Sequence, residues 1–313
     1  MPRNPLIIPC IVLSALLVAS FTGNILQSAN DLRAAPSQPS ESSQDVQTAE
    51  TEPEEEIPTE TVQYIYIYDN GAEHREYPLL EGVSLNDYNM ERLTATENKR
   101  RALYDEDGNK RTRFGIDVSA HQGFIDWDKV AADGVEFAFL RIGYRGYETG
   151  RMVEDAMFRA NYEGAVNAGI DVGAYFFSQA ISAEEGAEEA EFVLSVLEDA
   201  EAKLTLPIVF DWEYPAEGEP ARTDDTTGET MTAACIEFCK TIKSSGNQPM
   251  YYATINTALF RYDLTQLTEF PLWLAEYRPE TAFPYEYAVW QYSSSGEIDG
   301  IDAFTDINIM FVN

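Results

Sequence analysis

Short apolar runs alternate with amphipathic stretches over the last two hundred or so residues of the chain. Short apolar runs are typical of buried strands, whereas apolar residues spaced three and four apart are typical of helices that cover a sheet. The pattern predicts strands at 114–119, 137–144, 171–179, 206–213, 248–254, 272–277, 287–294 and 307–312. It predicts helices at 154–168, 182–202 and 229–245, and Gly169 and Gly246 lie where the first and third of these would end.

Eight strands that alternate with helices over about two hundred residues are typical of an α/β barrel. The connections after Thr254, Tyr277 and Ser294 leave room only for short helices or for none. The sequence therefore predicts an irregular, TIM-barrel-like (β/α) barrel of about eight strands over residues 114–313, with a regular first half and a compressed second half.

Acidic and aromatic residues gather at the ends of the predicted strands, and in a parallel barrel the C-terminal ends of the strands carry the active site. Aromatic faces pack on sugar rings and carboxylates accept hydrogen bonds from sugar hydroxyls, so this set is typical of a carbohydrate cleft. In chain order its members are Asp117, Arg141, Tyr175, Phe177, Asp211, Glu213, Tyr251 or Tyr252, Trp273, Glu276, Arg278, Trp290, Gln291 and Tyr292, with Asp306 just before the last strand. Besides the four acids Asp117, Asp211, Glu213 and Asp306, the site candidates that we select as substrate-binding residues are Arg141, Tyr175, Phe177, Tyr251, Trp273, Glu276, Trp290, Gln291 and Tyr292.

The most informative short motif is Asp211-Trp212-Glu213, which ends an apolar run. Residues two apart on a strand share a face, so we expect the carboxyl groups of Asp211 and Glu213 to be neighbours. Two close carboxyl groups do not both ionise freely, and an aromatic cleft raises the pKa of the less solvated one. One acid and one base are what glycosidic bond cleavage requires.

The N-terminal third divides into three segments. Residues 1–27 hold an almost wholly apolar stretch at 5–21, which predicts either a retained membrane anchor with its N-terminus inside or a cleavable signal peptide. Residues 28–60 carry nine acids against one base, which predicts a solvated linker. Residues 61–113 begin with an alternating strand pattern at 62–68 and a turn signal, and we expect a small preamble that packs on the barrel or serves as a stalk.

Charge and cysteine content exclude several partners. Residues 114–313 hold 35 acids against 11 bases, a net charge of −24, which argues against nucleic acid and anionic lipid surfaces as partners. With only two histidines and three cysteines in the chain, no zinc cluster of the usual spacing can be assembled. We expect no metal and no cofactor, and the sequence leaves the oligomeric state unknown.

Five motifs, taken in order, resemble a known family. They are FGIDVSAHQG at 114–123, DWE at 211–213, LWLAEY at 272–277, WQY at 290–292 and DIN at 306–308. Together they resemble the successive motifs of glycoside hydrolase family 25, the Chalaropsis-type lysozymes or N-acetylmuramidases. The resemblance covers about two thirds of the chain.

The resemblance implies hydrolysis, with net retention, of the β-1,4 bond between N-acetylmuramic acid and N-acetylglucosamine in peptidoglycan glycan strands. It implies that Glu213 protonates the leaving oxygen. Asp211 would either orient the acetamido group of the substrate or act as the nucleophile, and the sequence leaves both open. Asp117 and Asp306 would bind sugar and help to keep Glu213 protonated.

Two other functions stay open at this point. One is a catalytically silent wall-binding or scaffold protein on the same barrel, although the four acids that such a protein is expected to lose are all present. The other is a glycosidase for a different N-acetylated polymer such as chitin. For any of these, the apolar N-terminal stretch predicts either the outer face of the plasma membrane or, if it is cleaved, secretion.

Overall fold

The computed structural model describes residues 64–69, 73–95, 100–215 and 220–312. The predicted anchor or signal segment (1–27) and the predicted linker (28–60) lie outside these residues. Among the described helices, none is long and apolar enough to cross a membrane.

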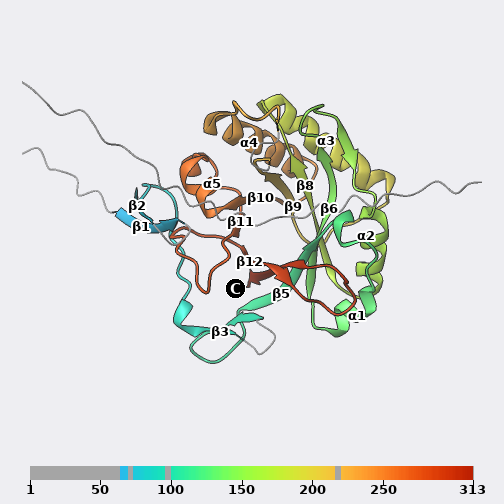
Figure 1. The fold of residues 1–313 in the computed structure, drawn as a ribbon, viewed down its shortest axis with the longest axis horizontal. Helices are drawn as coiled ribbons and strands as arrows, with labels where there is room; N and C mark the ends of the chain where they lie inside the picture. The colour runs from blue at the N-terminus through green and yellow to red at the C-terminus, as the bar shows by residue number, and fades with distance from the viewer. Residues whose placement is uncertain (1–63, 70–72, 96–99, 216–219, 313) are drawn as a thin grey trace, which may run out of the picture. The chain divides into compact units, whose positions relative to one another are not determined.

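Within the described residues, eight strands close into a barrel with helices on its outer side (Figure 1). In order around the barrel they are β5 (Thr112–Val118), β6 (Phe137–Arg145), β8 (Asp171–Ser178), β9 (Ile208–Trp212), β10 (Pro249–Thr254), β11 (Leu272–Ala275), β12 (Val289–Gly296) and β13 (Thr305–Phe311). The predicted fold class is confirmed, and each predicted strand overlaps an observed one.

The direction of the last strand differs from the expected parallel barrel. The other seven barrel strands (β5, β6 and β8 to β12) pair in parallel, but β13 is antiparallel to both β12 and β5. Only residues 297–304 separate β12 from β13, and a parallel pairing would need a longer crossover. The start of β13 therefore lies at the same end of the barrel as the ends of the parallel strands.

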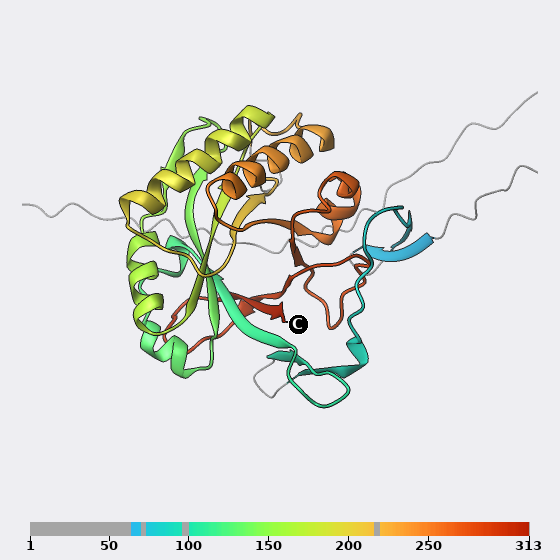
Figure 2. The same cartoon turned by 180° about the vertical axis from the view of Figure 1, so that it is seen from behind.

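Helices cover the first half of the barrel, as seen from both sides in Figures 1 and 2. The long ones are α2 (Phe158–Asn167), α3 (Ala183–Asp199) and α4 (Gly228–Ser244), and the short ones are α1 (Trp127–Ala132) and α5 (Ile255–Phe260). The positive φ angles of Gly169 (78°) and Gly246 (88°) follow the ends of α2 and α4, as expected for residues that stop helices. Helix α2 starts later than predicted because β7 (Met152–Glu154) pairs with the edge of β6 instead.

Side-chain alternation along the strands divides the core into two layers. The inner layer fills the barrel and includes Phe137, Phe139, Tyr252 and Trp273. The outer layer lies between the barrel and the helices and continues under the N-terminal segment. Small residues make room for the inner aromatic rings: a Cβ at Gly115 would overlap the ring of Phe137.

The described part of residues 64–113 forms two small hairpins and packs against the barrel. One hairpin joins β1 (Tyr64–Asp69) to β2 (Glu73–Pro78), as the strand and turn pattern predicts, and the other joins β3 (Leu93–Ala95) to β4 (Arg101–Leu103). The Tyr88 ring stacks on Phe311 with the ring centroids 3.9 Å apart. The Arg101 guanidinium lies over the ring of Tyr292, 4.5 Å from its centroid. The domain boundary at 113/114 stays a prediction.

A close helix contact provides a test of the outer layer. Gly186 on α3 faces α4 so closely that a Cβ there would overlap the carbonyl oxygen of Ala234. We expect Gly186→Ala to lower the free energy of unfolding by about 1–3 kcal/mol through overpacking, although alanine is the better helix former. Urea denaturation measures this. Ser195→Ala, at an exposed position of the same helix, is the matched control, and equal stability of both variants would contradict the close packing.

Candidate active site

A cavity of about 300 Å³ opens at the end of the barrel where β5 to β11 finish and β13 begins. Nine of the residues that the sequence marks as site candidates line it: Asp117, Arg141, Tyr175, Phe177, Asp211, Glu213, Trp273, Gln291 and Asp306. The antiparallel direction of β13 explains how Asp306, at the start of its strand, reaches the same cavity as Asp117, at the end of its own.

Four candidates do not line this cavity. Tyr251, Trp290 and Tyr292 belong to the outer core layer, because they alternate with the inward residues Tyr252 and Gln291 on their strands. The hydroxyl of Tyr292 accepts a hydrogen bond from the backbone N–H of Arg101 (3.2 Å). The carboxylate of Glu276 is turned away and accepts a hydrogen bond from the backbone N–H of Ala282 (3.1 Å). The structure therefore does not place these four predicted substrate-binding residues at the cavity, and for the three aromatic residues the predicted register is wrong by one residue.

Strand β9 presents Asp211 and Glu213 on its inner face and Trp212 on its outer face. The indole Nε1 of Trp212 donates to the carbonyl oxygen of Ala180 (3.0 Å), and the side chain of Gln179 donates to the carbonyl oxygen of Glu213 (2.7 Å). Both bonds fix the end of the strand. The local backbone thus directs the carboxyl groups of Asp211 and Glu213 into the same cavity.

Both carboxyl groups of this pair bind protons more tightly than free acids do. Burial raises the pKa of Glu213 to about 7, and the charge of Asp117 acts in the same direction. Burial also raises the pKa of Asp211 well above its usual range, and the charges of Glu213 and Asp117 raise it further. The two carboxyl groups raise or lower each other's pKa, so they titrate as a pair rather than as two independent acids.

Asp117 is buried at the end of β5, and its Oδ2 atom accepts two hydrogen bonds from side-chain amides. Gln291 donates at 2.9 Å and Asn308 at 2.7 Å. Burial raises the pKa of Asp117 to about 6, while the two amide donors act in the opposite direction. Among the four acids of the cavity, Asp117 is therefore the one whose negative charge the protein stabilises best, through hydrogen bonds from Gln291 and Asn308.

Asp306 lies directly opposite Asp117 in the antiparallel pairing of β13 with β5. Burial raises the pKa of Asp306 to about 8, and the charges of Asp117 and Glu213 raise it as well. Like charges on directly opposed residues are unfavourable in a sheet. Protonation of Asp306 relieves this repulsion.

Arg141 brings a cation to the cavity from β6. Its Nε donates to Oδ2 of the buried Asp155 at 2.7 Å. Asp155 also accepts backbone hydrogen bonds from Ala120 (3.1 Å) and Met157 (2.9 Å), so the orientation of the guanidinium is firmly set. The positive charge of Arg141 opposes the rise in the pKa of Asp211.

The cavity also contains residues outside the predicted site set. Tyr252 and Tyr277 line the cavity and Asn308 binds Asp117. Tyr252 is paired with Trp273 in the register of β10 and β11, which the sequence alone does not reveal. Tyr277 and Asn308 stand inside the motifs at 272–277 and 306–308. Ser119, His121 and Gln122 complete the wall. Among the described residues, no group of three or more His, Cys, Asp or Glu residues is arranged to hold a metal ion.

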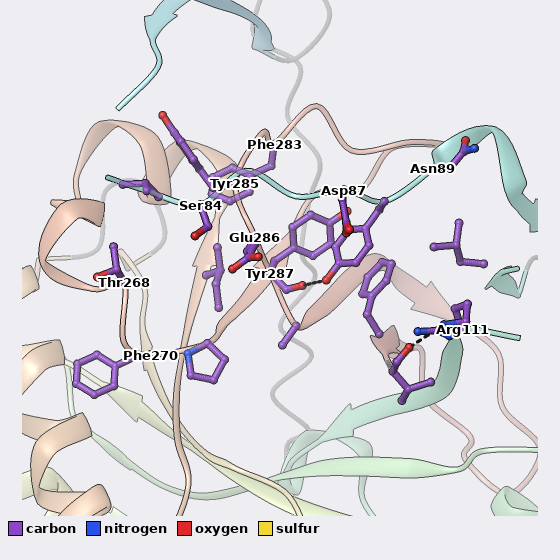
Figure 3. Close-up of a pocket in the computed structure, with 18 of the residues that line it drawn as sticks. Ser84, Asp87, Asn89, Arg111, Thr268, Phe270, Phe283, Tyr285, Glu286 and Tyr287 are labelled. Carbon is purple, nitrogen blue, oxygen red and sulfur yellow. Dashed lines mark hydrogen bonds between the residues drawn. The ribbon is translucent and has the colours of Figure 1, made fainter. Parts of the chain in front are cut away.

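A second and larger cavity, of about 720 Å³, lies at the other end of the barrel (Figure 3). It is lined by residues that precede β11 and β12, that follow β13, or that belong to the N-terminal segment. There the hydroxyl of Tyr88 donates to the carbonyl oxygen of Tyr287 (2.6 Å), and Arg111 donates to that of Val312 (3.1 Å). The acid pair opens into the smaller cavity, which is therefore the candidate active site.

The family model of glycosyl hydrolases family 25 matches residues 116–301, more than half of the chain. The chain belongs to this family. The resemblance in the five sequence motifs is thereby confirmed. A family 25 assignment also agrees with the position of the acid pair, since both Asp211 and Glu213 lie inside the matched region.

Known proteins similar to this family 25 chain include lysozyme M1 of Streptomyces globisporus, which is 29% identical over 204 residues. That match covers 62% of this chain and 66% of the relative. The solved bacterial lysozyme of Streptomyces coelicolor is 28% identical, with a TM-score of 0.51, and the match covers 64% of this chain and 92% of that one.

The modular autolysin LytC of Streptococcus pneumoniae, solved in complex with a synthetic peptidoglycan ligand, shares the fold with a TM-score of 0.57 at 22% identity. The match covers 79% of this chain and 56% of LytC. The chain thus spans less than two thirds of the length of lysozyme M1 and of LytC.

The raised pKa values make the stability of this family 25 protein depend on pH. Asp306 has a pKa of about 8 in the folded protein against an ordinary value of 3.8, so the folded state binds more protons between these values. The free energy of unfolding contributed by this group is therefore highest below about pH 4 and falls as the pH rises to about 8. We expect Asp306→Asn to raise Tm by roughly a few degrees at pH 8.5 and by much less at pH 4.5.

Thermal unfolding at several pH values checks this expectation. Asp302→Asn removes an exposed acid four residues earlier and is the control for the general loss of one negative charge. If the Tm of Asp306→Asn and the Tm of the native protein change with pH in the same way, the raised pKa of Asp306 is contradicted.

Proposed function

We propose that the protein is a peptidoglycan hydrolase, an N-acetylmuramidase that cleaves the β-1,4 bond between N-acetylmuramic acid and N-acetylglucosamine. The observation that carries the proposal is that Asp211 and Glu213, two neighbouring carboxyl groups with raised pKa values, both line the cavity at the strand ends. The family assignment and the lysozyme names of the relatives support this substrate class.

Glu213 is the general acid of the proposed reaction. It lines the cavity and is less buried than Asp211, so its carboxyl group is the more exposed of the pair to a glycosidic oxygen. With a pKa of about 7, a large share of Glu213 is protonated at neutral pH, and the proton passes to the leaving oxygen without a large energetic penalty. With net retention, the same residue then acts as the base that activates the incoming water.

Asp211 is the partner that stabilises the developing positive charge on the sugar. It is fully buried, and its Oδ1 atom has no hydrogen-bond partner among the described residues. An oxygen of this kind is free to accept a hydrogen bond from the acetamido N–H of the substrate or to bond to the anomeric carbon. Either role leads to retention, the first through the acetamido oxygen and the second through a covalent glycosyl intermediate.

The aromatic wall of the cavity matches the apolar faces of sugar rings. Trp273 lies at its base, stacked on Phe139 with centroids 4.7 Å apart and bordered by Tyr252 at 5.1 Å. Tyr277 at the rim keeps 55% of its surface exposed, which leaves its ring available to a substrate. Arg141, Asp117 and Asp306 supply the polar contacts.

The function is tested by digestion of purified peptidoglycan with the protein and with Glu213→Gln, followed by analysis of the reducing ends. We expect reducing N-acetylmuramic acid from the native protein, and a loss of activity of about 100-fold or more in the variant, which keeps the shape but has no proton to donate. Glu237→Gln, at a partly exposed position of α4 outside the cavity, is the control.

Other outcomes point elsewhere. Equal product from the native protein and Glu213→Gln would contradict the acid assignment. Reducing N-acetylglucosamine would move the specificity to the other bond of the glycan. Activity on chitin with none on peptidoglycan would favour another N-acetylated polymer, and no activity on either would favour a wall-binding scaffold.

We also propose that the chain acts outside the cell, close to the plasma membrane. The apolar stretch at 5–21 supports a single-pass anchor, or secretion if it is cleaved, and the acidic residues 28–60 support an extended linker. A flexible coil of about thirty residues spans roughly 30 Å, and charge repulsion extends it.

Deletion of residues 1–27 behind a heterologous cleavable signal peptide tests the anchor. We expect the protein and its activity to move from the cell fraction to the medium, as measured by immunoblotting and by zymography. Full-length protein in the medium would support cleavage instead, and a deletion variant that stays with the cells would contradict the anchor.

A further inference from the structure

Two buried amide side chains meet at one oxygen of Asp117. Gln291 on β12 and Asn308 on β13 both donate to Oδ2, at 2.9 Å and 2.7 Å. The two residues are directly paired in the antiparallel register of these strands. The arrangement gives Asp117 two donors that come from the protein itself.

The far end of each amide is held by an aromatic donor. The indole Nε1 of Trp273 donates to Oδ1 of Asn308 (2.8 Å), and the hydroxyls of Tyr277 (2.8 Å) and Tyr252 (3.1 Å) donate to Oε1 of Gln291. An indole nitrogen can only donate, so the oxygen of Asn308 must face Trp273 and its NH₂ group must face Asp117. The hydroxyls of Tyr277 and Tyr252 can donate or accept, and here they hold Gln291 in the corresponding orientation by donating to its Oε1 atom.

The locked amides favour the anionic form of Asp117. A primary amide that is free to rotate would present its oxygen to a neutral carboxyl group as readily as its NH₂ group to a carboxylate. Here the rotation is prevented, and hydrogen bonds to a charged acceptor are stronger than those to a neutral one. The amides therefore select one protonation state of Asp117.

The remaining groups around Asp117 compete with it for protons. Asp211 and Glu213 face it from β9 and Asp306 faces it from β13, while Arg141 on β6 and His121 line the same cavity. The tyrosines that face it are Tyr175, Tyr252 and Tyr277. A fixed negative charge on Asp117 leaves the available protons to the other three acids.

We propose that Gln291 and Asn308 are positioning residues, locked by Tyr277, Tyr252 and Trp273, that hold Asp117 as an anion and thereby keep the catalytic proton on the Asp211–Glu213 pair. The inference rests on the proposed function and adds to it a hydrogen-bond network, made by the two amides and their aromatic partners, that decides which carboxyl group is charged. Tyr277 connects this hydrogen-bond network to the substrate, because its exposed ring borders the cavity while its hydroxyl donates to Gln291.

Two variants of the full-length chain test the proposal. Gln291→Met keeps the volume of the side chain and removes both its donor and its acceptor. Tyr277→Phe keeps the ring that faces the substrate and removes only the hydroxyl that orients Gln291. Tyr262→Phe is the control, because it removes a buried tyrosine hydroxyl outside the cavity that has no hydrogen-bond partner among the described residues.

The first measurement is independent of activity. Carbon-13 NMR of aspartate labelled at the carboxyl carbon follows the titration of Asp117, which is assigned with Asp117→Asn. We expect its midpoint to rise by about one pH unit in Gln291→Met, the size of one lost charge-assisted hydrogen bond, and by less in Tyr277→Phe. An unchanged midpoint in a folded Gln291→Met protein would overturn the proposal, as would an equal shift in Tyr262→Phe.

The second measurement is the pH dependence of kcat and KM on soluble peptidoglycan fragments. We expect the acidic limb of the kcat profile to move to higher pH in both variants, because Asp117 is then protonated at a higher pH. We also expect the maximum of kcat to fall, because in part of the protein the proton lies on Asp117 instead of on the Asp211–Glu213 pair. In Tyr277→Phe, KM should stay within about twofold, since the ring remains.

The outcomes separate the two proposals. A native protein without activity on peptidoglycan contradicts the proposed function, while the NMR titration still decides the role of the amides. An active native protein whose variants lose rate equally at all pH values, with unshifted limbs, overturns the positioning role. If Gln291→Met does not fold, Tyr277→Phe alone decides by the same two criteria.

Discussion

The closure of the barrel by an antiparallel last strand is the constraint on which the site depends. Its register sets Asp306 opposite Asp117 and Asn308 opposite Gln291. A parallel last strand would carry Asp306 to the opposite end of the barrel, away from the other three acids. The short connection between β12 and β13 that forbids a parallel crossover is thus also what completes the acid cluster.

Alternation along the strands then separates chemistry from packing. On β9, Asp211 and Glu213 point inward while Trp212 is fixed to the carbonyl of Ala180 on the outside. On β12, Gln291 points inward between Trp290 and Tyr292, which bind the outer layer and the N-terminal segment. The acids are poorly solvated because the inner layer beneath them is aromatic, and this desolvation raises their pKa values. Burying four acids at this end of the barrel lowers the stability of the folded protein, and the same burial keeps carboxyl groups protonated near neutral pH.

The sequence alone was sufficient for the strands and for the acid pair, because both depend on local patterns. Apolar runs place each of the eight strands, and the spacing of Asp211 and Glu213 places them on one face. What it could not provide was the pairing between distant strands. The direction of β13, the short strand β7 that displaces the start of α2, and the locks on Asp117 all depend on contacts between residues far apart in the chain. The choice of Tyr251 over Tyr252 is an error of one residue, and one residue is enough to turn a side chain from the cavity to the outer layer.

Charge balance in the cavity explains why the amides matter more than the one arginine. Arg141 forms an ion pair with Asp155, which also accepts hydrogen bonds from two backbone N–H groups. The negative charge of Asp155 offsets much of the positive charge of Arg141, so Arg141 stabilises the four acids only weakly. Without an available cation, the cluster can lower its repulsion only by binding protons, and burial alone would distribute those protons among all four acids. Hydrogen-bond donors that cannot rotate break this symmetry, because they stabilise a negative charge at one position and at no other. The identity of the proton donor is therefore set as much by the neutral residues Gln291 and Asn308 as by the acids themselves.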